Sequence, residues 1–200
     1  MALLPFLEVN RIEAGCDEVG RGCLAGPVVA AAVILPNHYH NPWINDSKQL
    51  EKKQREDLVE EIQQHALAWA IGEASVEEID KINILKASFL AMERAINALS
   101  LTPEHLLIDG NAWKSKLQYP FTCVVKGDSL LASIASASIL AKVHRDKKME
   151  DLAKEFPHYG WETNAGYATK IHRDGIVRHG ITPWHRKSFQ LLPSQLSLGI

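Results

Sequence analysis

The sequence predicts an α/β fold on a mixed sheet, with α+β as the alternative, in one domain that spans residues 1–200. Short apolar runs typical of strands alternate along the chain with longer segments of helical periodicity. A chain of 200 residues is long enough for one well-buried domain and short for two, and no repeat or linker divides it. We therefore expect a single folding unit with a helical C-terminal region at about 158–200.

Five segments are expected to form strands. The first two, 11–20 and 27–36, are joined by a turn in which Gly20, Gly22 and Gly26 permit a tight backbone. The others lie at 67–75, 104–111 and 121–128.

Helices are expected between and after these strands. Residues 45–66 predict a loop that leads into a helix, and 83–99 is strongly periodic. Ser75, with Glu78 three residues later, has the pattern of a capping box. A long helix is expected from Ser129 to Phe156, with Ser and Ala in its first turns that suit close packing on a sheet. A further helix is expected over 164–180.

Composition excludes several classes of protein. No basic leader precedes an apolar core, and no apolar run reaches the roughly 18 residues of a membrane helix. An odd, sparse set of three cysteines favours a reducing compartment over a disulfide framework. We expect a cytoplasmic protein without a membrane span, whose cysteines are small buried residues: Cys16, Cys23 and Cys123.

Charge is distributed unevenly, although the net charge is only −2. Residues 1–100 hold 9 Lys and Arg against 15 Asp and Glu, and residues 101–200 hold 13 against 9. The basic second half can face phosphates, although asymmetry of this size is also common by chance. The nine histidines show no metal-site spacing and are expected at the surface or at helix ends.

Four acids lie where apolar strands give way to glycine-containing turns, the usual place for functional groups in open sheets. Hard oxygen ligands without a matching His or Cys cluster favour Mg²⁺ or Mn²⁺ over zinc. Carboxylates that converge on such cations are used for phosphodiester hydrolysis, where two metals can stabilise the attacking and leaving oxygens. The four are Asp17, Glu18, Asp109 and Asp128.

Each acid also has an alternative interpretation. Asp128 can cap the long helix, and Asp109 can be a turn residue. Neighbours on a regular strand point to opposite faces, so Glu18 must lie where its strand bends or ends to share a metal with Asp17. Asp146, four residues after a lysine on the long helix, is better explained as a solvent-exposed ion pair.

The motifs in combination resemble bacterial ribonuclease HII from about residue 15 to residue 189. They are "GCDEVGRGCLAGPVVAAAVIL", "NDSKQL", "LLIDGN", "VVKGDSLLASIASASILAKVHRD", "NAGYATKIH" and "HGITPWHRKSF". The resemblance implies a ribonuclease H-like fold, a mixed five-stranded sheet flanked by helices. It also implies that Asp17, Glu18, Asp109 and Asp128 are catalytic and bind two divalent cations, Mg²⁺ or Mn²⁺.

The resemblance implies substrate contacts as well. The backbone of the "GRG" element would contact the ribonucleotide 2′-OH, the group that distinguishes RNA from DNA. A tyrosine would lie beside the RNA–DNA junction, although its own sequence context leaves core packing open. Three further residues resemble phosphate-contacting positions. The full set is Gly20, Arg21, Gly22, Lys48, Tyr167, His185 and Arg186.

The implied activity is endonucleolytic cleavage of RNA in hybrids, including cleavage 5′ of a single ribonucleotide embedded in DNA, which leaves a 3′-hydroxyl and a 5′-phosphate. Type HIII fits less well, because that family has an extra N-terminal domain, "GKG" for "GRG" and a glutamate for the last aspartate. An idle nucleic-acid-binding module and an unrelated metal-dependent phosphatase or exonuclease are the competing hypotheses. We expect a monomer, since no coiled-coil pattern is present.

Overall fold

A computed structural model describes residues 3–44 and 51–193. Its centre is a five-stranded mixed sheet in the order β3-β2-β1-β4-β5. β1 pairs antiparallel with β2, and β2 with β3, whereas β1, β4 and β5 run parallel to one another. The strands are β1 Glu13–Val19, β2 Val28–Ile34, β3 Ala68–Ala74, β4 His105–Asp109 and β5 Phe121–Val124. The expected mixed five-stranded sheet is confirmed.

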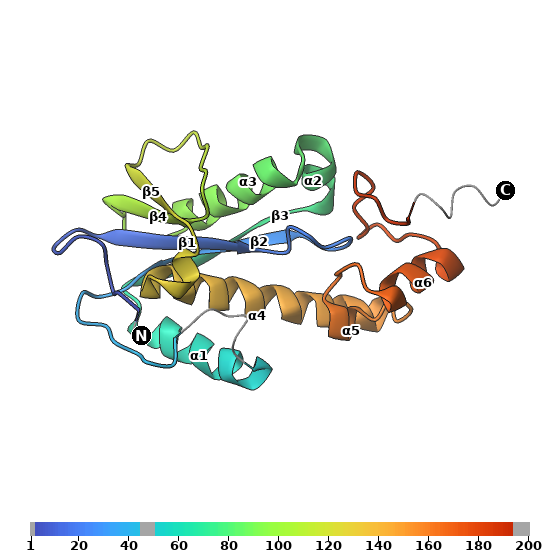
Figure 1. Cartoon of the computed structure of the whole chain (residues 1–200), viewed down its shortest axis with the longest axis horizontal. Helices are drawn as coiled ribbons and strands as arrows, with labels where there is room; N and C mark the ends of the chain where they lie inside the picture. Colours follow the sequence, from blue (N-terminus) through green and yellow to red (C-terminus); the bar gives the residue numbers. More distant parts are fainter. Residues whose placement is uncertain (1–2, 45–50, 194–200) are drawn as a thin grey trace.

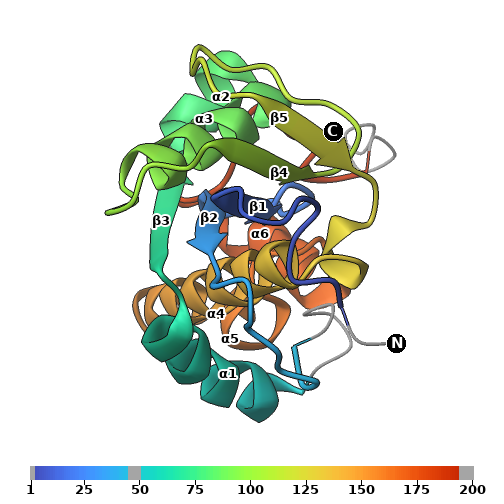
Figure 2. The ribbon, with the colours of Figure 1, turned by 90° about the vertical axis from the view of Figure 1, so that its left-hand side faces the viewer.

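Helices cover both faces of this sheet (Figures 1 and 2). One face packs against α3 and the other against α4, which in turn packs on α1. The helices are α1 Lys52–His65, α2 Val76–Ile82, α3 Ile84–Asn97, α4 Ala132–Glu155, α5 Trp161–Asn164 and α6 Lys170–His179. All seven residues of β2 are buried, as expected for a strand covered on both faces.

The long helix packs very closely on β1. A Cβ on Gly15 would lie 2.3 Å from the backbone carbon of Ser133, so the strand needs glycine where the helix crosses it. The small residues expected to permit this approach are buried along the first turns of α4. The helix begins at Ala132 instead of Ser129, because a short 3₁₀ turn, η1 Gly127–Ser129, precedes it.

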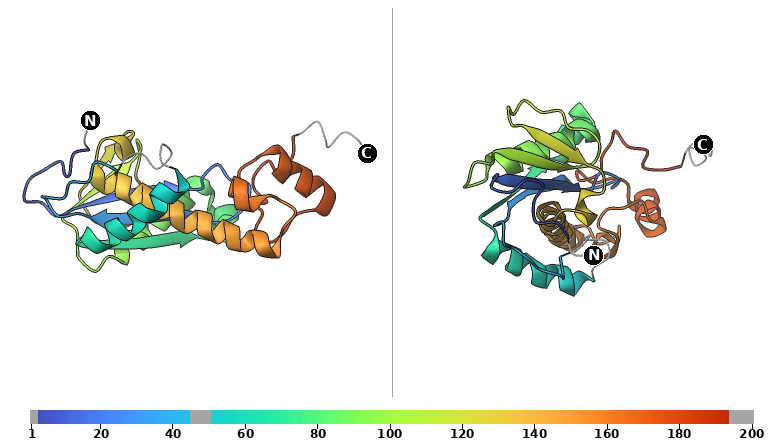
Figure 3. Two further views of the ribbon diagram at one scale, coloured as in Figure 1. Left: turned by 90° about the horizontal axis from the view of Figure 1, so that it is seen from below. Right: turned by 60° about the vertical axis from the view of Figure 1, so that its left-hand side comes forward.

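The C-terminal region extends beyond the end of the sheet, along the second half of α4 (Figure 3). The segment after α6 then returns to the turn that links β1 and β2. Gly26 N–H donates to the Trp184 carbonyl at 2.9 Å, and Arg186 N–H donates to the Leu24 carbonyl at 2.9 Å. Two segments far apart in the sequence therefore share a backbone pairing directly behind residues 20–22.

The structure confirms the predicted capping box at Ser75 and shortens the helix predicted over 164–180. Ser75 accepts from Glu78 N–H and the Glu78 side chain accepts from Ser75 N–H, which confirms the capping box. The helix expected over 164–180 forms only from Lys170, since Ala165 and Gly166 adopt left-handed backbone angles that end α5. No helix within the described ranges is long and apolar enough to cross a membrane.

Candidate active site

The sheet topology brings three of the predicted acids to one edge. β1 and β4 are parallel neighbours, and their register pairs Cys16 with Ile108. The next residue on each strand is an acid, Asp17 on β1 and Asp109 on β4. Parallel strands end at the same edge of a sheet, which is where open α/β sheets carry their sites.

Asp17 is 5% exposed and lies close to two of the other acids, Glu18 and Asp109. Its pKa is raised well above the ordinary value by burial, by the neighbouring carboxylate of Glu18 and by that of Asp109. Two hydrogen bonds oppose this rise: one involves the Ser138 side chain of α4, and the other comes from Glu18 N–H at 2.7 Å. Negative charge is therefore concentrated at this edge beyond what the local donors neutralise.

Glu18 is the penultimate residue of β1, so the prediction that it lies near the end of its strand is correct. Burial raises its pKa, and the Arg21 guanidinium, 3.0 Å from its carboxylate, opposes that rise. The charge of Asp109 also acts on Glu18. Because β4 ends at Asp109, the end of β1 projects past this neighbour, although Glu18 still pairs with Ala30 of β2 on its other side.

Asp128 is held near the other acids by a hydrogen bond of the preceding residue, Gly127. Gly127 N–H donates to the Asp109 carboxylate at 2.8 Å, and Asp128 follows, 5% exposed, in the η1 turn. The turn is reached through Lys126 in a left-handed conformation (φ 57°). The N-cap residue of α4 is Leu131, so Asp128 does not hold the N-cap position of the long helix.

The donor chemistry at this edge suits a divalent cation. Carboxylate oxygens are the ligands that Mg²⁺ and Mn²⁺ prefer, and the raised pKa values of Asp17 and Glu18 show that positive charge would stabilise the cluster. Within the described ranges, no three His, Cys, Asp or Glu side chains are grouped as they stand so that they could hold one metal ion. Binding therefore requires the carboxylates to turn towards a common point.

The "GRG" turn lies directly after these acids, with Arg21 and Gly22 exposed and Gly20 buried. Gly20 has φ 94°, and a Cβ there would lie 2.2 Å from Nε of Arg145. Around Gly22 the space is open, and the nearest atom to a Cβ would be Cε1 of Tyr167 at 3.9 Å. The backbone of the turn is thus fixed from behind and accessible from the front.

Tyr167 lies in front of this turn and is 42% exposed, so its ring is not a core residue. Leu24 N–H donates to the Gly166 carbonyl at 2.8 Å, which ties the tyrosine loop to the "GRG" segment. Partial burial and the neighbouring Cys23 raise the pKa of Tyr167, so its hydroxyl remains a hydrogen-bond donor at neutral pH. Trp184, in contrast, packs partly buried against the C-terminal core.

Two of the other predicted substrate contacts, His185 and Arg186, do not lie at this surface. His185 and Arg186 are 0% exposed, although the resemblance implies that they contact phosphate. Arg186 donates to three backbone carbonyls, and His185 accepts from Thr182 N–H at 2.9 Å, so both are engaged inside the protein. Lys48 lies outside the described residues.

Asp146 forms the expected ion pair, with its carboxylate 2.8 Å from Nζ of Lys142. The pair is partly buried rather than fully solvent-exposed, and Arg55 approaches the same carboxylate at 3.9 Å. The carboxylate of Asp146 is therefore already paired with basic side chains.

Two contributors to the site were missed from the sequence. Ser138 hydrogen-bonds Asp17, and Arg145 lies behind Gly20. The signal that could have found Arg145 is its position on α4, where it falls at helical spacing between buried Ser138 and Met149. An arginine on a buried stripe of a helix needs polar partners, so its position alone indicates a structural role.

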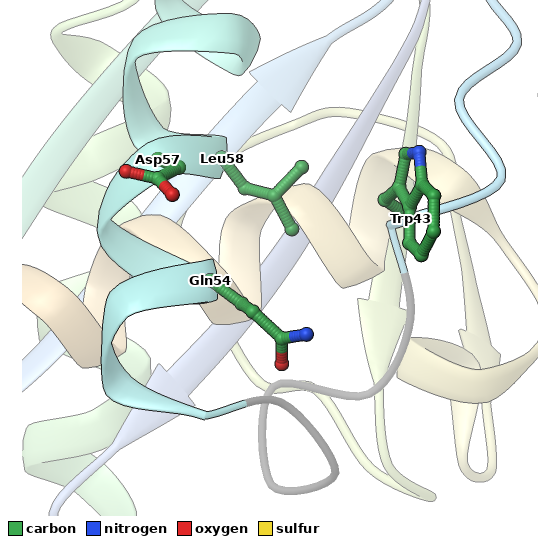
Figure 4. Close-up of a pocket in the computed structure, with 4 residues that line it drawn as sticks. All are labelled: Trp43, Gln54, Asp57 and Leu58. Atoms are coloured by element: carbon green, nitrogen blue, oxygen red, sulfur yellow. The ribbon is translucent and has the colours of Figure 1, made fainter.

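A separate hollow lies between α1 and the segment before it, lined by Trp43, Gln54, Asp57 and Leu58 (Figure 4). None of the four predicted acids lines it. Among the described residues its lining has one carboxylate and no cation, which is not the chemistry expected of a phosphate or metal site.

Comparison with known proteins agrees with this geometry. The family model described as Ribonuclease HII matches residues 14–192. A ribonuclease HII from Parabacteroides distasonis is 62% identical over 197 residues, covering 98% of this chain and 99% of that protein.

Solved structures share the fold. The ribonuclease H2 of Pyrococcus horikoshii OT3 superposes with a TM-score of 0.75 at 24% identity, covering 90% of this chain and 94% of that one. Bst-RNase HIII in complex with Mn²⁺ has a TM-score of 0.72 at 20% identity and covers 94% of this chain but 70% of its own. The chain therefore belongs to the ribonuclease HII family and is a ribonuclease H enzyme of type HII, a nuclease that acts on RNA in RNA–DNA duplexes.

Proposed function

We propose that the enzyme cuts the RNA strand of RNA–DNA hybrids and also nicks duplex DNA on the 5′ side of a single embedded ribonucleotide. The products would be a 3′-hydroxyl and a 5′-phosphate. One observation carries the proposal: the crowded carboxylates of Asp17, Glu18 and Asp109 adjoin an exposed "GRG" backbone with a half-exposed tyrosine in front of it. Hydrolytic groups and a surface suited to reading a sugar thus lie within one site.

The acids have the chemistry for hydrolysis at a phosphodiester. Two divalent cations, Mg²⁺ or Mn²⁺, held by Asp17, Glu18, Asp109 and Asp128, would activate the attacking water and neutralise charge on the departing 3′ oxygen. Burial first, and then the neighbouring carboxylates, raise the pKa of Asp17, and the negative charge gathered there repels a nucleic acid in the absence of cations. We therefore expect productive substrate binding to depend on the divalent ion.

The turn and the tyrosine have the chemistry for selecting the sugar. The exposed backbone of Arg21 and Gly22 offers peptide groups that a 2′-hydroxyl can hydrogen-bond, and a deoxyribose cannot make that contact. A site built to bond a hydroxyl discriminates strongly against the analogue that lacks it. Tyr167 offers an aromatic face beside the same position for stacking or ribose packing.

The experiment uses an end-labelled DNA duplex with one internal ribonucleotide, incubated with Mg²⁺ or Mn²⁺. We expect one nick 5′ of the ribonucleotide. An all-DNA duplex and the Asp109→Asn protein serve as controls, and neither should yield product.

Asn at position 109 can still accept from Gly127 N–H, so the Asp109→Asn protein is expected to keep the fold. Cleavage of long hybrids without the single nick would overturn the embedded-ribonucleotide part of the proposal. If the folded protein cuts neither substrate with metal present, the idle binding module is the better explanation.

A further inference from the structure

Two arginines lie completely buried behind the "GRG" turn. Arg145 comes from α4 and Arg186 from the segment after α6, and both are 0% exposed. Buried arginines are rare and normally pair with a carboxylate. Within the described ranges neither of them forms an ion pair with an acid. Their hydrogen bonds must therefore explain why they are there.

All six guanidinium nitrogens donate to backbone carbonyls. Arg145 donates from Nε to Pro27, from Nη1 to Ala165 and from Nη2 to Ala25, at 2.8–3.0 Å. Arg186 donates from Nε to Gly26 at 2.9 Å, from Nη1 to Arg21 at 3.0 Å and from Nη2 to Pro27 at 3.2 Å. The accepting carbonyls belong to the turn between β1 and β2 and to the loop before Tyr167.

One of these bonds acts directly on the "GRG" element. The Arg21 carbonyl and Gly22 N–H belong to the same peptide group, and in a trans peptide the two point in opposite directions. Because Arg186 holds the carbonyl inward, Gly22 N–H is directed outward. In the part of the chain that the structure describes, this N–H has no acceptor. It is available to a ligand in front of the turn.

The positive charge also strengthens this donor. A carbonyl that accepts from a guanidinium polarises its peptide group, so the N–H on the other side becomes a better donor. Arg186 keeps its charge at neutral pH, since burial and then the charge of Arg145 lower its pKa only to about 10. A neutral side chain of similar size would fill the space but would not polarise the peptide.

We propose that Arg186 is a positioning residue that directs and polarises the Gly22 N–H towards the substrate sugar, with Arg145 holding the rest of the turn and the Tyr167 loop in register. The proposal deepens the proposed function and rests on it. It replaces the phosphate contact implied for Arg186 by the resemblance. The arginine acts through the peptide group of the turn and does not itself touch the substrate.

A positioning role and a phosphate contact for Arg186 predict different behaviour when substrate binds. In uniformly ¹⁵N-labelled Asp109→Asn protein, we expect the Nε–H signals of Arg145 and Arg186 to exchange slowly with water. They should remain protected when a duplex with one ribonucleotide is added, while the Gly22 amide signal shifts. Rapid exchange in the free protein, or release of Arg186 to a phosphate on duplex binding, would overturn the proposal. This measurement requires no variant of either arginine.

Kinetics supply the second test, with Arg186→Lys, which keeps a charge but lacks the planar set of donors. We expect kcat on the single-ribonucleotide duplex to fall about 10- to 100-fold, as for a misplaced reacting group. KM should change less than about threefold, because the lost interaction serves orientation. Binding of an all-DNA duplex should be unaltered. A raised KM with unchanged kcat and weaker all-DNA binding would instead identify a phosphate contact.

Two control variants separate this effect from general damage. Arg94→Lys removes an arginine whose Nη1 donates to the Glu73 carbonyl at 2.6 Å, in a part of the fold that holds none of the predicted site residues. Met92→Ala opens a cavity in the core under α3 and provides a destabilised reference. Both should keep the wild-type kcat at a temperature where they are folded. If Met92→Ala loses as much kcat as Arg186→Lys at equal stability, the positioning role is wrong.

Wild-type protein in the same assay distinguishes the two proposals. If it does not nick the single-ribonucleotide duplex, the proposed function fails. If it does nick and folded Arg186→Lys nicks equally well, only the positioning role fails. Should Arg186→Lys not fold, the exchange measurement on the intact arginine still decides.

Discussion

The imidazoles of His172 and His185 meet Nε2 to Nε2 at 3.1 Å inside the C-terminal core. His172 Nδ1 lies 2.9 Å from the Tyr167 carbonyl and must donate to it, so its Nε2 accepts from Trp161 Nε1–H. Nδ1 of His185 accepts from Thr182 N–H, so its Nε2 carries a proton, which shares the one Nε2 lone pair of His172 with Trp161 Nε1–H. The contacts are thus satisfied only when both rings are neutral.

This pair predicts a loss of stability in mild acid. Burial, then the neighbouring His172, lower the pKa of His185 to about 4, whereas an unfolded histidine titrates near 6.5. The unfolded chain therefore binds protons first as pH falls, and the contribution to stability, complete above about 6.5, is lost on the way to 4. We expect about 1 kcal/mol lost by pH 5.5. That is about 2–4 °C in Tm, measured by circular dichroism.

Two variants test whether His185 causes this loss of stability in acid. His40→Gln changes an exposed histidine and should keep the pH dependence, whereas His185→Gln should lower Tm at pH 7 and flatten the curve between 7 and 5.5. Glu73 acts in a separate window: the side chains of His144 and Lys148 lower its pKa to about 2, so its contribution is lost only below about 4.5. An equal wild-type Tm at pH 7 and 5.5 would contradict the prediction.

The buried pair also shows what the sequence could not predict. Histidines without metal spacing are expected at the surface or at helix ends, and "HRKSF" has the composition of an exposed basic segment. Burial of His185 and Arg186 depends on pairing with the β1–β2 turn, and the bond from Arg186 to Gly26 spans 160 residues. No local pattern encodes a contact at that separation.

The strands and the acids could be predicted because their signals are local in the sequence. Each strand is a local apolar run that ends at a turn; Asp109 ends β4, and Asp17 lies two residues before the end of β1. The parallel pairing of β1 with β4 is not visible in the local sequence. Prediction of the site did not depend on it, because it required only that the acids lie at the same edge of the sheet. The prediction failed at the long helix, where the η1 turn delays its start to Ala132, because 3₁₀ and α-helical turns share the same short-range pattern.

Substitutions in the "GRG" turn should separate stability from recognition. Gly20→Ala introduces a Cβ into the Arg145 side chain at a residue with φ 94°, so we expect a loss of about 1–3 kcal/mol. Gly22→Ala meets open space and should change stability by less than about 1 kcal/mol. Its methyl group would nevertheless stand where the sugar approaches. Urea unfolding and the nicking assay, run on both proteins, check the two effects.

The contrast between these variants is the critical result. Gly22→Ala should fold normally and lose nicking of the single ribonucleotide, while Gly20→Ala should lose stability first. If Gly22→Ala keeps wild-type nicking, the front of the turn does not approach the sugar. If Gly20→Ala is as stable as wild type, the close packing of Arg145 behind the turn is wrong.

Replacement of Tyr167 should affect activity and leave the fold intact. The ring is 42% exposed, so Tyr167→Phe and Tyr167→Ala should each shift Tm only slightly. If the ring stacks against the junction, Tyr167→Ala loses about 1–3 kcal/mol of binding, or about 5- to 150-fold in kcat/KM. Tyr167→Phe keeps the ring and loses only the hydroxyl, so its loss should be smaller. Tyr119→Phe serves as a control, because Tyr119 packs against the core under α3. Equal activity of Tyr167→Ala and wild type would exclude a contact.

Salt dependence should be modest for an enzyme that acts on nucleic acid. The net charge is −2, and many cations outside the turn are already paired with acids. These pairs include Lys52 with Glu150, Lys142 with Asp146, Lys148 with Glu73, and Lys170 with Asp174. Each phosphate neutralised adds about −0.9 to the log–log slope, so few contacts give a slope shallower than about −6. Fluorescence anisotropy of a labelled duplex between about 50 and 200 mM KCl measures it. A steeper slope would show that these ion pairs open on binding and that their lysines turn to the phosphates.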